Sequence, residues 1–304
     1  MPNLKHIRDR IISINNTQKI TRAMKMVAAA KVRKSELRVK AARPYSKELI
    51  EMFHKILGSL NDLSDEQIKA KDPIDNFPVL LEKRDIKSVG ILVVTSNKGL
   101  AGAFNANVIR YTLKKIEEYR KSSISCKLFV VGQKGFNALK PALKNQNFEI
   151  LQTYTKFAQD PTSASARIVA EDMAQALVEN KIDSIEIVTT RFKNMMSYSV
   201  EEWKVLPIEK TEMKSDGYDL EMDFEPDLGS ILQKIVPLFI SNTIYQSFLE
   251  STASELAARM TAMSAACNNA QEMIRTLTID YNKARQSAIT QEITEVVSGA
   301  DSLK

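Results

Sequence analysis

The stretch Leu249–Ala288 decides the fold, and it reads LESTASELAARMTAMSAACNNAQEMIRTLTIDYNKARQSA. Its small and apolar residues recur in alternating steps of four and three, at Leu249, Ala253, Leu256, Met260, Met263, Cys267, Ala270, Ile274, Leu277, Tyr281, Ala284 and Ala288. This spacing is typical of the seam of a left-handed coiled coil. Because several seam residues are alanine, a partner helix can approach closely. The stretch therefore predicts a long helix that needs a helical partner.

Glycine and proline, which interrupt helices, are absent from two long stretches near the ends of the chain. These stretches lie between Pro2 and Pro44 and between Pro237 and Gly299. At about 1.5 Å per residue, the second would span roughly 90 Å as a helix, more than the diameter of a compact domain. Such a helix cannot bury itself within one globule, so it must pack on another helix or on another protein.

The N-terminal stretch has the pattern expected of the partner helix. Its apolar residues start with the same steps, at Leu4, Ile7, Ile11 and Ile14. The pattern predicts a slip of phase across residues 15–18, after which Ile20, Met24 and Val27 resume it. Both helices leave a central domain, so we expect them to pair antiparallel. The C-terminal helix is the longer one, and its tip beyond about residue 283 is predicted to be a lone helix.

The middle of the chain alternates between apolar strands and helices. We expect strands at 89–95, 127–131, 148–155, 184–190 and 197–206, and helices at 106–120 and 163–180. This order favours a parallel sheet with right-handed crossovers. The predicted fold class is α/β, with a long antiparallel coiled coil formed by the N- and C-terminal helices and a central Rossmann-like α/β domain. The expected segments are a coiled-coil helix at 1–60, a linker at 61–87, the Rossmann-like domain at 88–206, an acidic linker at 207–227 and a coiled-coil helix at 228–304.

Composition excludes several classes of protein. The 304 residues are 44% hydrophobic and 26% charged, which fits a folded chain, and no apolar run is long enough for a membrane span. Two histidines argue against a zinc site, and Cys126 and Cys267 form no CxxC motif. The first fifty residues hold thirteen Lys and Arg against three acids. This basic helix is either an ordinary solvated face or a surface for an acidic protein, a nucleic acid or a membrane.

The loop Ser96–Asn105, SNKGLAGAFN, follows the first predicted strand, where a phosphate site would lie in this fold class. It matches neither GxGxxG nor GxxxxGK[ST], and a glycine-containing turn explains it equally well. No catalytic motif is present either. Two other classes remain open: a standalone α/β enzyme that dimerises through a coiled-coil arm, and a nucleic-acid binder that uses the basic helix.

Two longer motifs go beyond composition. Residues 16–31 read NTQKITRAMKMVAAAK, and residues 281–300 read YNKARQSAITQEITEVVSGA. Both strongly resemble the γ subunits of F-type ATP synthases, and the resemblance extends over essentially the whole chain. It implies a central rotor shaft that passes the rotation of an ion-driven c-ring to the catalytic β subunits. It also implies a non-catalytic subunit with the α and β subunits, the ε subunit and the c-ring as partners. Mg-ATP and ADP would be bound by the α and β subunits, with no cofactor in this chain.

The resemblance also assigns contact residues. It implies contacts with β-subunit loops and the surrounding ring at Met24, Arg259, Arg285, Gln286, Thr290 and Glu292. Glu225 matches the foot region that faces the c-ring, although Met222 and Phe224 stand where family members often carry tyrosines. Chloroplast relatives carry an extra segment with a redox-active cysteine pair, which is lacking here, so no thiol switch is expected. The implied location is peripheral, on the cytoplasmic face of a bacterial inner membrane, with a mitochondrial or plastid equivalent as the alternative.

Overall fold

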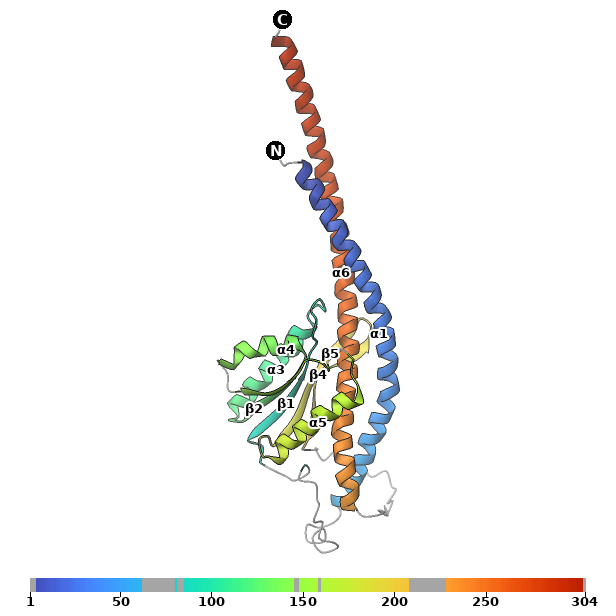
Figure 1. Ribbon diagram of the computed structural model, residues 1–304, viewed down its shortest axis with the longest axis vertical. Helices are drawn as coiled ribbons and strands as arrows, with labels where there is room; N and C mark the ends of the chain where they lie inside the picture. Colours follow the sequence, from blue (N-terminus) through green and yellow to red (C-terminus); the bar gives the residue numbers. More distant parts are fainter. Residues whose placement is uncertain are drawn as a thin grey trace. The chain divides into compact units, whose positions relative to one another are not determined.

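The computed structural model describes residues 4–61, 80, 85–144, 148–157, 160–207 and 228–302. The chain forms two compact units, one of Met1–Ala30 with Arg259–Lys304 and one of Lys31–Ala258. The two long helices, α1 (Leu4–Asn61) and α6 (Leu228–Ser302), contribute residues to both units (Figure 1). The predicted fold class is therefore confirmed: long terminal helices and a central α/β domain. The five consecutive segments expected from the sequence stay a prediction, since the compact units group the chain differently.

The larger unit contains a five-stranded sheet in the order β3-β2-β1-β4-β5. Its strands are β1 (Ser88–Val94), β2 (Ser125–Val131), β3 (Phe148–Tyr154), β4 (Ser184–Asn194) and β5 (Ser197–Leu206). The pairs β1–β2, β1–β4 and β2–β3 are parallel. From Val89 to Val94 every residue of β1 is buried, as expected of a parallel strand covered on both faces.

The expectation of a parallel sheet is wrong for β5, which pairs antiparallel with β4. Only two residues, Met195 and Met196, separate the two strands, and so short a connection joins antiparallel strands only. The Asn194 side chain holds this turn, because its Oδ1 accepts hydrogen bonds from the backbone N–H groups of Met196 and Ser197, both at 2.9 Å. β4 also continues to Asn194, beyond the predicted end at residue 190.

Helices cover both faces of the sheet (Figure 1). α3 (Phe104–Lys121), α4 (Gln133–Leu139) and the short 3₁₀ helix η2 (Lys140–Lys144) lie on one face. The core on this face includes Ile91, Val108, Ile116, Leu128 and Leu139. α5 (Ser163–Val178) covers the other face together with the part of α6 and the end of α1 that belong to this unit. The core there includes Phe53, Leu92, Phe129, Met173, Ile187 and Phe239.

Two local features fix the ends of elements in this unit. Thr162 caps α5, because its hydroxyl accepts from the backbone N–H of Ser165 while the Ser165 hydroxyl accepts from the N–H of Thr162. Gly132 closes β2 with a φ of 96°, in the region that favours glycine. A side chain at Gly132 would also overlap the backbone carbonyl of Thr95. The turn from β2 into α4 therefore requires glycine.

Candidate partner-contact site

The smaller unit pairs the N-terminal part of α1 with the C-terminal part of α6, and the two run in opposite directions as predicted (Figure 1). On α6 the predicted seam is confirmed. Between Asn268 and Ala288 the residues that are buried or half-buried are Ala270, Ile274, Leu277, Tyr281, Ala284 and Ala288. These are the seam positions, and every residue between them is exposed. Spacing alone therefore identified the contact face of this part of α6.

The predicted slip of phase on α1 is wrong. Ile20 and Val27 are 60% and 56% exposed, so they lie outside the contact face. The seam instead continues from Ile14 without interruption, through the half-buried Gln18 and Thr21. It then reaches Lys25, also half-buried, and the buried Ala28. The prediction failed because it followed the apolar residues. Which residues face the partner helix is set by the steps of three and four around α1, whatever the polarity of the residues.

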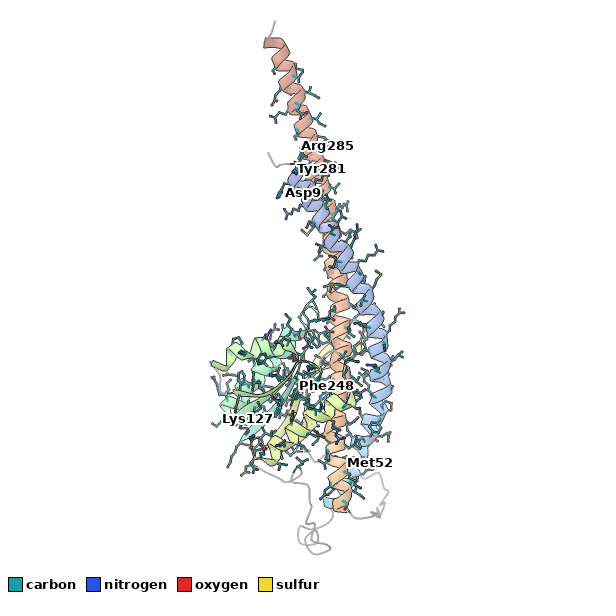
Figure 2. All side chains as sticks on the ribbon, viewed as in Figure 1. Asp9, Met52, Lys127, Phe248, Tyr281 and Arg285 are labelled. Atoms are coloured by element: carbon teal, nitrogen blue, oxygen red, sulfur yellow. The ribbon has the colours of Figure 1, made fainter. Side chains whose placement is uncertain are left out.

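The tip of α6 is exposed, as predicted. Figure 1 shows α6 extending past the start of α1, and Figure 2 shows Tyr281 level with Asp9 in this view. Every residue from Ile289 to Ser298 is exposed. Its large apolar side chains have exposed fractions of 46% for Ile289, 58% for Ile293, 71% for Val296 and 55% for Val297. Within the described residues, nothing in the chain itself covers them.

Four of the residues assigned by resemblance lie together near this tip. Arg285, Gln286, Thr290 and Glu292 are all exposed on α6. Their hydrogen bonds are local: the Thr290 hydroxyl donates to the Gln286 carbonyl at 3.0 Å, and the Thr290 carbonyl accepts from the Thr294 hydroxyl at 2.8 Å. Among the described side chains, no ion pair engages Arg285 or Glu292. The charged and amide groups of this cluster are thus available to another molecule.

The other assigned residues lie elsewhere. Arg259 and Met24 are half-buried, Arg259 on α6 and Met24 on α1. Arg259 precedes Arg285 by about 39 Å of helix at 1.5 Å per residue, so the structure separates the assigned set into two groups. Glu225 lies outside the described residues, as do Met222 and Phe224.

The loop after β1 is held by its own polar groups. The Asn105 side chain accepts from the backbone N–H of Ser96 at 3.0 Å, and Leu100 and Gly102 adopt positive φ angles of 65° and 56°. Residues of α6 cover the adjacent ends of β1 and β2. The cavity between them is about 10 Å³ and is lined by Thr95, Ser96, Val131, Phe248, Ser251 and Glu255, among others. A space of that size holds about one water molecule, whereas ligand pockets measure about 300 Å³ or more.

A buried ionic network in the larger unit was missed at the level of sequence. The Glu250 side chain on α6 is fully buried and forms an ion pair with Arg43 on α1, with 2.7 Å between Oε1 and Nε. Both side chains also bond to the backbone of Phe192 on β4. The one signal in the sequence was the position of Glu250 directly after the apolar Phe248 and Leu249. A carboxylate buried at such a position needs a partner of opposite charge.

A second buried carboxylate lies under α3. Glu186 on β4 accepts a hydrogen bond from the Tyr119 hydroxyl at 2.5 Å. Burial raises the pKa of Glu186, and the neighbouring Glu202 raises it further, while the Tyr119 hydrogen bond and Lys115 oppose them. Burial also raises the pKa of the Cys126 thiol to about 12, so this cysteine is unreactive at neutral pH.

In the described part of the chain, no three His, Cys, Asp or Glu side chains are grouped so that they could hold a metal ion. Within the same ranges, no helix combines the length and the hydropathy that a membrane span requires.

A family profile and individual relatives both match this chain over essentially its whole length and indicate the same family. A protein-family profile described as ATP synthase matches residues 3–303. The ATP synthase gamma chain of Gloeothece citriformis is 38% identical over 329 aligned positions, with both chains fully covered. That of Trichlorobacter lovleyi is 36% identical over 305 positions, again with full coverage of both.

Solved structures share the fold. A chain of the Euglena gracilis mitochondrial ATP synthase, in an OSCP/F1/c-ring structure, matches with a TM-score of 0.66 and 17% identity, covering 99% of this chain and 94% of that one. A chain of the Tetrahymena thermophila mitochondrial ATP synthase, from its central stalk and c-ring, matches with a TM-score of 0.56 and 22% identity. This match covers 81% of the present chain and 99% of the other.

Proposed function

Since the chain belongs to the ATP synthase gamma chain family, whose members are non-catalytic subunits that form the central stalk of a rotary complex, we propose that it is a rotor shaft. In this role it passes the rotation of a c-ring, driven by an ion gradient, to the catalytic β subunits for ATP synthesis, and the reverse during hydrolysis. The observation that carries the proposal is the exposed apolar tip of α6 beyond the antiparallel pair. A helix of this kind needs a sleeve supplied by other subunits.

The tip is suited to a bearing rather than to a fixed joint. Ile289, Ile293, Val296 and Val297 present an apolar surface with no directional bonds. A sleeve around a turning shaft must remake its contacts at each of three positions, and apolar contacts allow this because they are non-directional. The tip therefore supports rotation inside the ring.

The polar residues on the tip and below it are suited to coupling. We assign contacts with the β-subunit loops to Met24, Arg259, Arg285, Gln286, Thr290 and Glu292, and contacts at the c-ring foot to Glu225. Charge-assisted hydrogen bonds are directional, so they can discriminate one rotational position from the next. The exposed guanidinium and amide of Arg285 and Gln286 are suited to this task.

ATP chemistry then belongs to the α and β subunits, which bind Mg-ATP and ADP. The support within this chain is the 10 Å³ cavity at the ends of β1 and β2, because α6 occupies the space that a nucleotide would need. The proposal therefore places nucleotide binding in the neighbouring subunits and not at this edge of the sheet.

The chain acts as a peripheral part of a membrane-associated ATP synthase. Its partners are then the α and β subunits, the ε subunit and the c-ring, on the cytoplasmic face of a bacterial plasma membrane. The gamma chains of bacteria such as Gloeothece and Trichlorobacter, which match over their full length, support a bacterial setting.

Affinity purification from native membranes tests the assignment. A tagged full-length chain is expected to co-purify with α, β, ε and c subunits, identified by mass spectrometry. The isolated assembly, fixed through its ring, should also rotate a probe on this chain when ATP is added. Recovery of the chain without α and β subunits would contradict the proposal.

A further inference from the structure

The end of β4 extends beyond its neighbour in the sheet. Pairing with β1 stops at Val188, so the segment Thr189–Asn194 has β5 along one side only. On the other side, the Thr189 hydroxyl donates to the Ser247 carbonyl of α6 at 3.2 Å. At Phe192 the backbone N–H donates to Glu250 at 2.8 Å and the carbonyl accepts from Arg43 at 2.6 Å. Hydrogen bonds to groups of the two long helices thus take the place of a further strand.

Glu250 lies at the centre of this arrangement with no exposed side-chain surface. Its carboxylate accepts four hydrogen bonds: from Arg43 Nε at 2.7 Å and Nη2 at 2.9 Å, from Gln246 Nε2 at 3.0 Å and from Phe192 N at 2.8 Å. A planar guanidinium bound through two nitrogens fixes both distance and angle. The pair therefore joins α1, α6 and β4 in one geometry.

Stability alone does not account for such a pair. An apolar pair of similar volume is often as stable or more stable, because the cost of removing the fully buried Glu250 and the 38% exposed Arg43 from water offsets their attraction. Most of the surrounding contacts between the helices are apolar, formed by Val32 and Val39 with Leu249, Ala253 and Leu256, and the neutral hydrogen bonds of Ser46 to Asn242 and Gln246 are longer, at 3.1 and 3.4 Å. Apolar contacts resist separation but allow sliding and rotation, because they have no preferred direction. Directional bonds are what fix the register.

We propose that Arg43 and Glu250 are positioning residues that lock the two long helices to the end of β4, so that torque on the α/β domain enters both helices without slippage. This proposal rests on the proposed function as a rotor shaft. It assigns a mechanical role to two residues that are not among the contact residues assigned above.

The test uses variants that separate register from stability. Arg43→Met with Glu250→Leu replaces the ion pair by an apolar pair of similar volume. Arg43→Lys keeps the charge and loses the two-nitrogen contact. The matched control is Glu36→Gln, which removes a half-buried carboxylate from an ion pair with the exposed Lys40 on α1. Each full-length variant is assembled with the α and β subunits of its complex.

Two probe positions locate any loss of stiffness. A probe attached at Lys121→Cys, exposed at the end of α3, is carried by the α/β domain. Torque between this probe and the long helices must therefore pass through the proposed lock. A probe attached at Lys47→Cys, exposed on α1, is carried by the helix itself, so torque reaches it without passing through the lock. In complexes stalled between ATP hydrolysis events, the angular variance of the probe measures torsional stiffness.

The double variant is expected to assemble but to melt below the wild type, because the backbone N–H and carbonyl of Phe192 lose their partners. Its angular variance should rise with the α3 label and stay unchanged with the α1 label, and Arg43→Lys should show the same pattern to a smaller degree. Should the double variant fail to assemble, Arg43→Lys alone decides. If the variants show the wild-type angular variance with both labels, or an equal rise with both, the proposed lock is overturned. The rotor assignment is unaffected as long as the wild-type complex rotates. If the wild-type chain is not part of any complex that rotates, the rotor assignment is overturned, and this proposal with it.

Discussion

At the scale of single residues, burial and partner chemistry decide how charged side chains behave. Glu186 and Glu250 are both buried carboxylates, 6% and 0% exposed as residues. Glu250 has a guanidinium opposite it, whereas Glu186 has a phenol and a second carboxylate nearby. The pKa of Glu186 is raised, because loss of solvent outweighs the Tyr119 hydrogen bond.

This shift predicts a pH dependence of stability. The folded chain keeps the Glu186 proton at pH values where the unfolded chain has lost it, so stability falls as pH rises from about 4.3, the ordinary glutamate pKa, through the raised folded pKa. Glu186→Gln should reduce that fall, because Gln carries no titrating proton and still accepts from Tyr119. Denaturant melts of the purified chain at several pH values measure it. Glu149→Gln, exposed on β3, is the control and should keep the wild-type slope.

Arg259 is expected to matter more for coupling than for assembly. Arg259→Ala should leave complex yield near normal and reduce ATP-driven ion pumping roughly ten-fold, since a hydrogen bond to a charged group contributes about 1.5–3 kcal/mol. Residual ATP hydrolysis should remain. Parallel measurements of yield, hydrolysis and pumping decide between the two roles, and normal pumping in this variant would remove Arg259 from the coupling set.

At the scale of elements, the contact face of α6 has little tolerance for charge. Ala270 is 6% exposed in the seam. Ala270→Asp should cost about 3 kcal/mol or more, because a carboxylate there is buried without a partner. The adjacent Gln271→Asp places the same charge on an exposed position and serves as control. Thermal melting of both chains and the yield of assembled complex measure the difference; equal melting temperatures would contradict a buried seam.

The last residues of α6 are expected to be dispensable. The helix α6 continues past Gly299 to Ser302. The residues that precede the deleted segment, Ile289–Ser298, are all exposed. Within the described residues, deleting 299–304 therefore uncovers no core. Deleting Gly299–Lys304 should therefore change turnover and pumping much less than Arg259→Ala does. Loss of turnover in the truncated chain, measured beside Arg259→Ala, would reverse the roles of the two regions.

At the scale of the whole molecule, the chain is expected to bind no nucleotide by itself. The space at the ends of β1 and β2 holds about one water. Calorimetry of the isolated chain with millimolar ATP or NAD should show no saturable heat. A saturable signal that disappears in Gly99→Val would instead support a nucleotide site in the loop after β1, and with it the enzyme class left open by the sequence.

The sequence by itself determined the elements that have a regular period or a buried apolar run. Steps of three and four on α6 identified its contact face, and runs such as VGILVV identified the strands. These signals are local, because burial on one side of a helix or on both faces of a strand leaves its mark within a few residues. The exposed tip followed from length alone.

The tertiary structure decided whatever depends on residues far apart in the chain. Gln18, Thr21 and Lys25 lie in the seam of α1 because their position around the helix faces the partner, although their polarity suggested otherwise. β5 runs antiparallel because of a two-residue turn. Arg43, Phe192 and Glu250 meet only because two helices pack beside the end of one strand. No local pattern encodes such a meeting, since each partner is specified by the packing of elements that lie up to 207 residues apart.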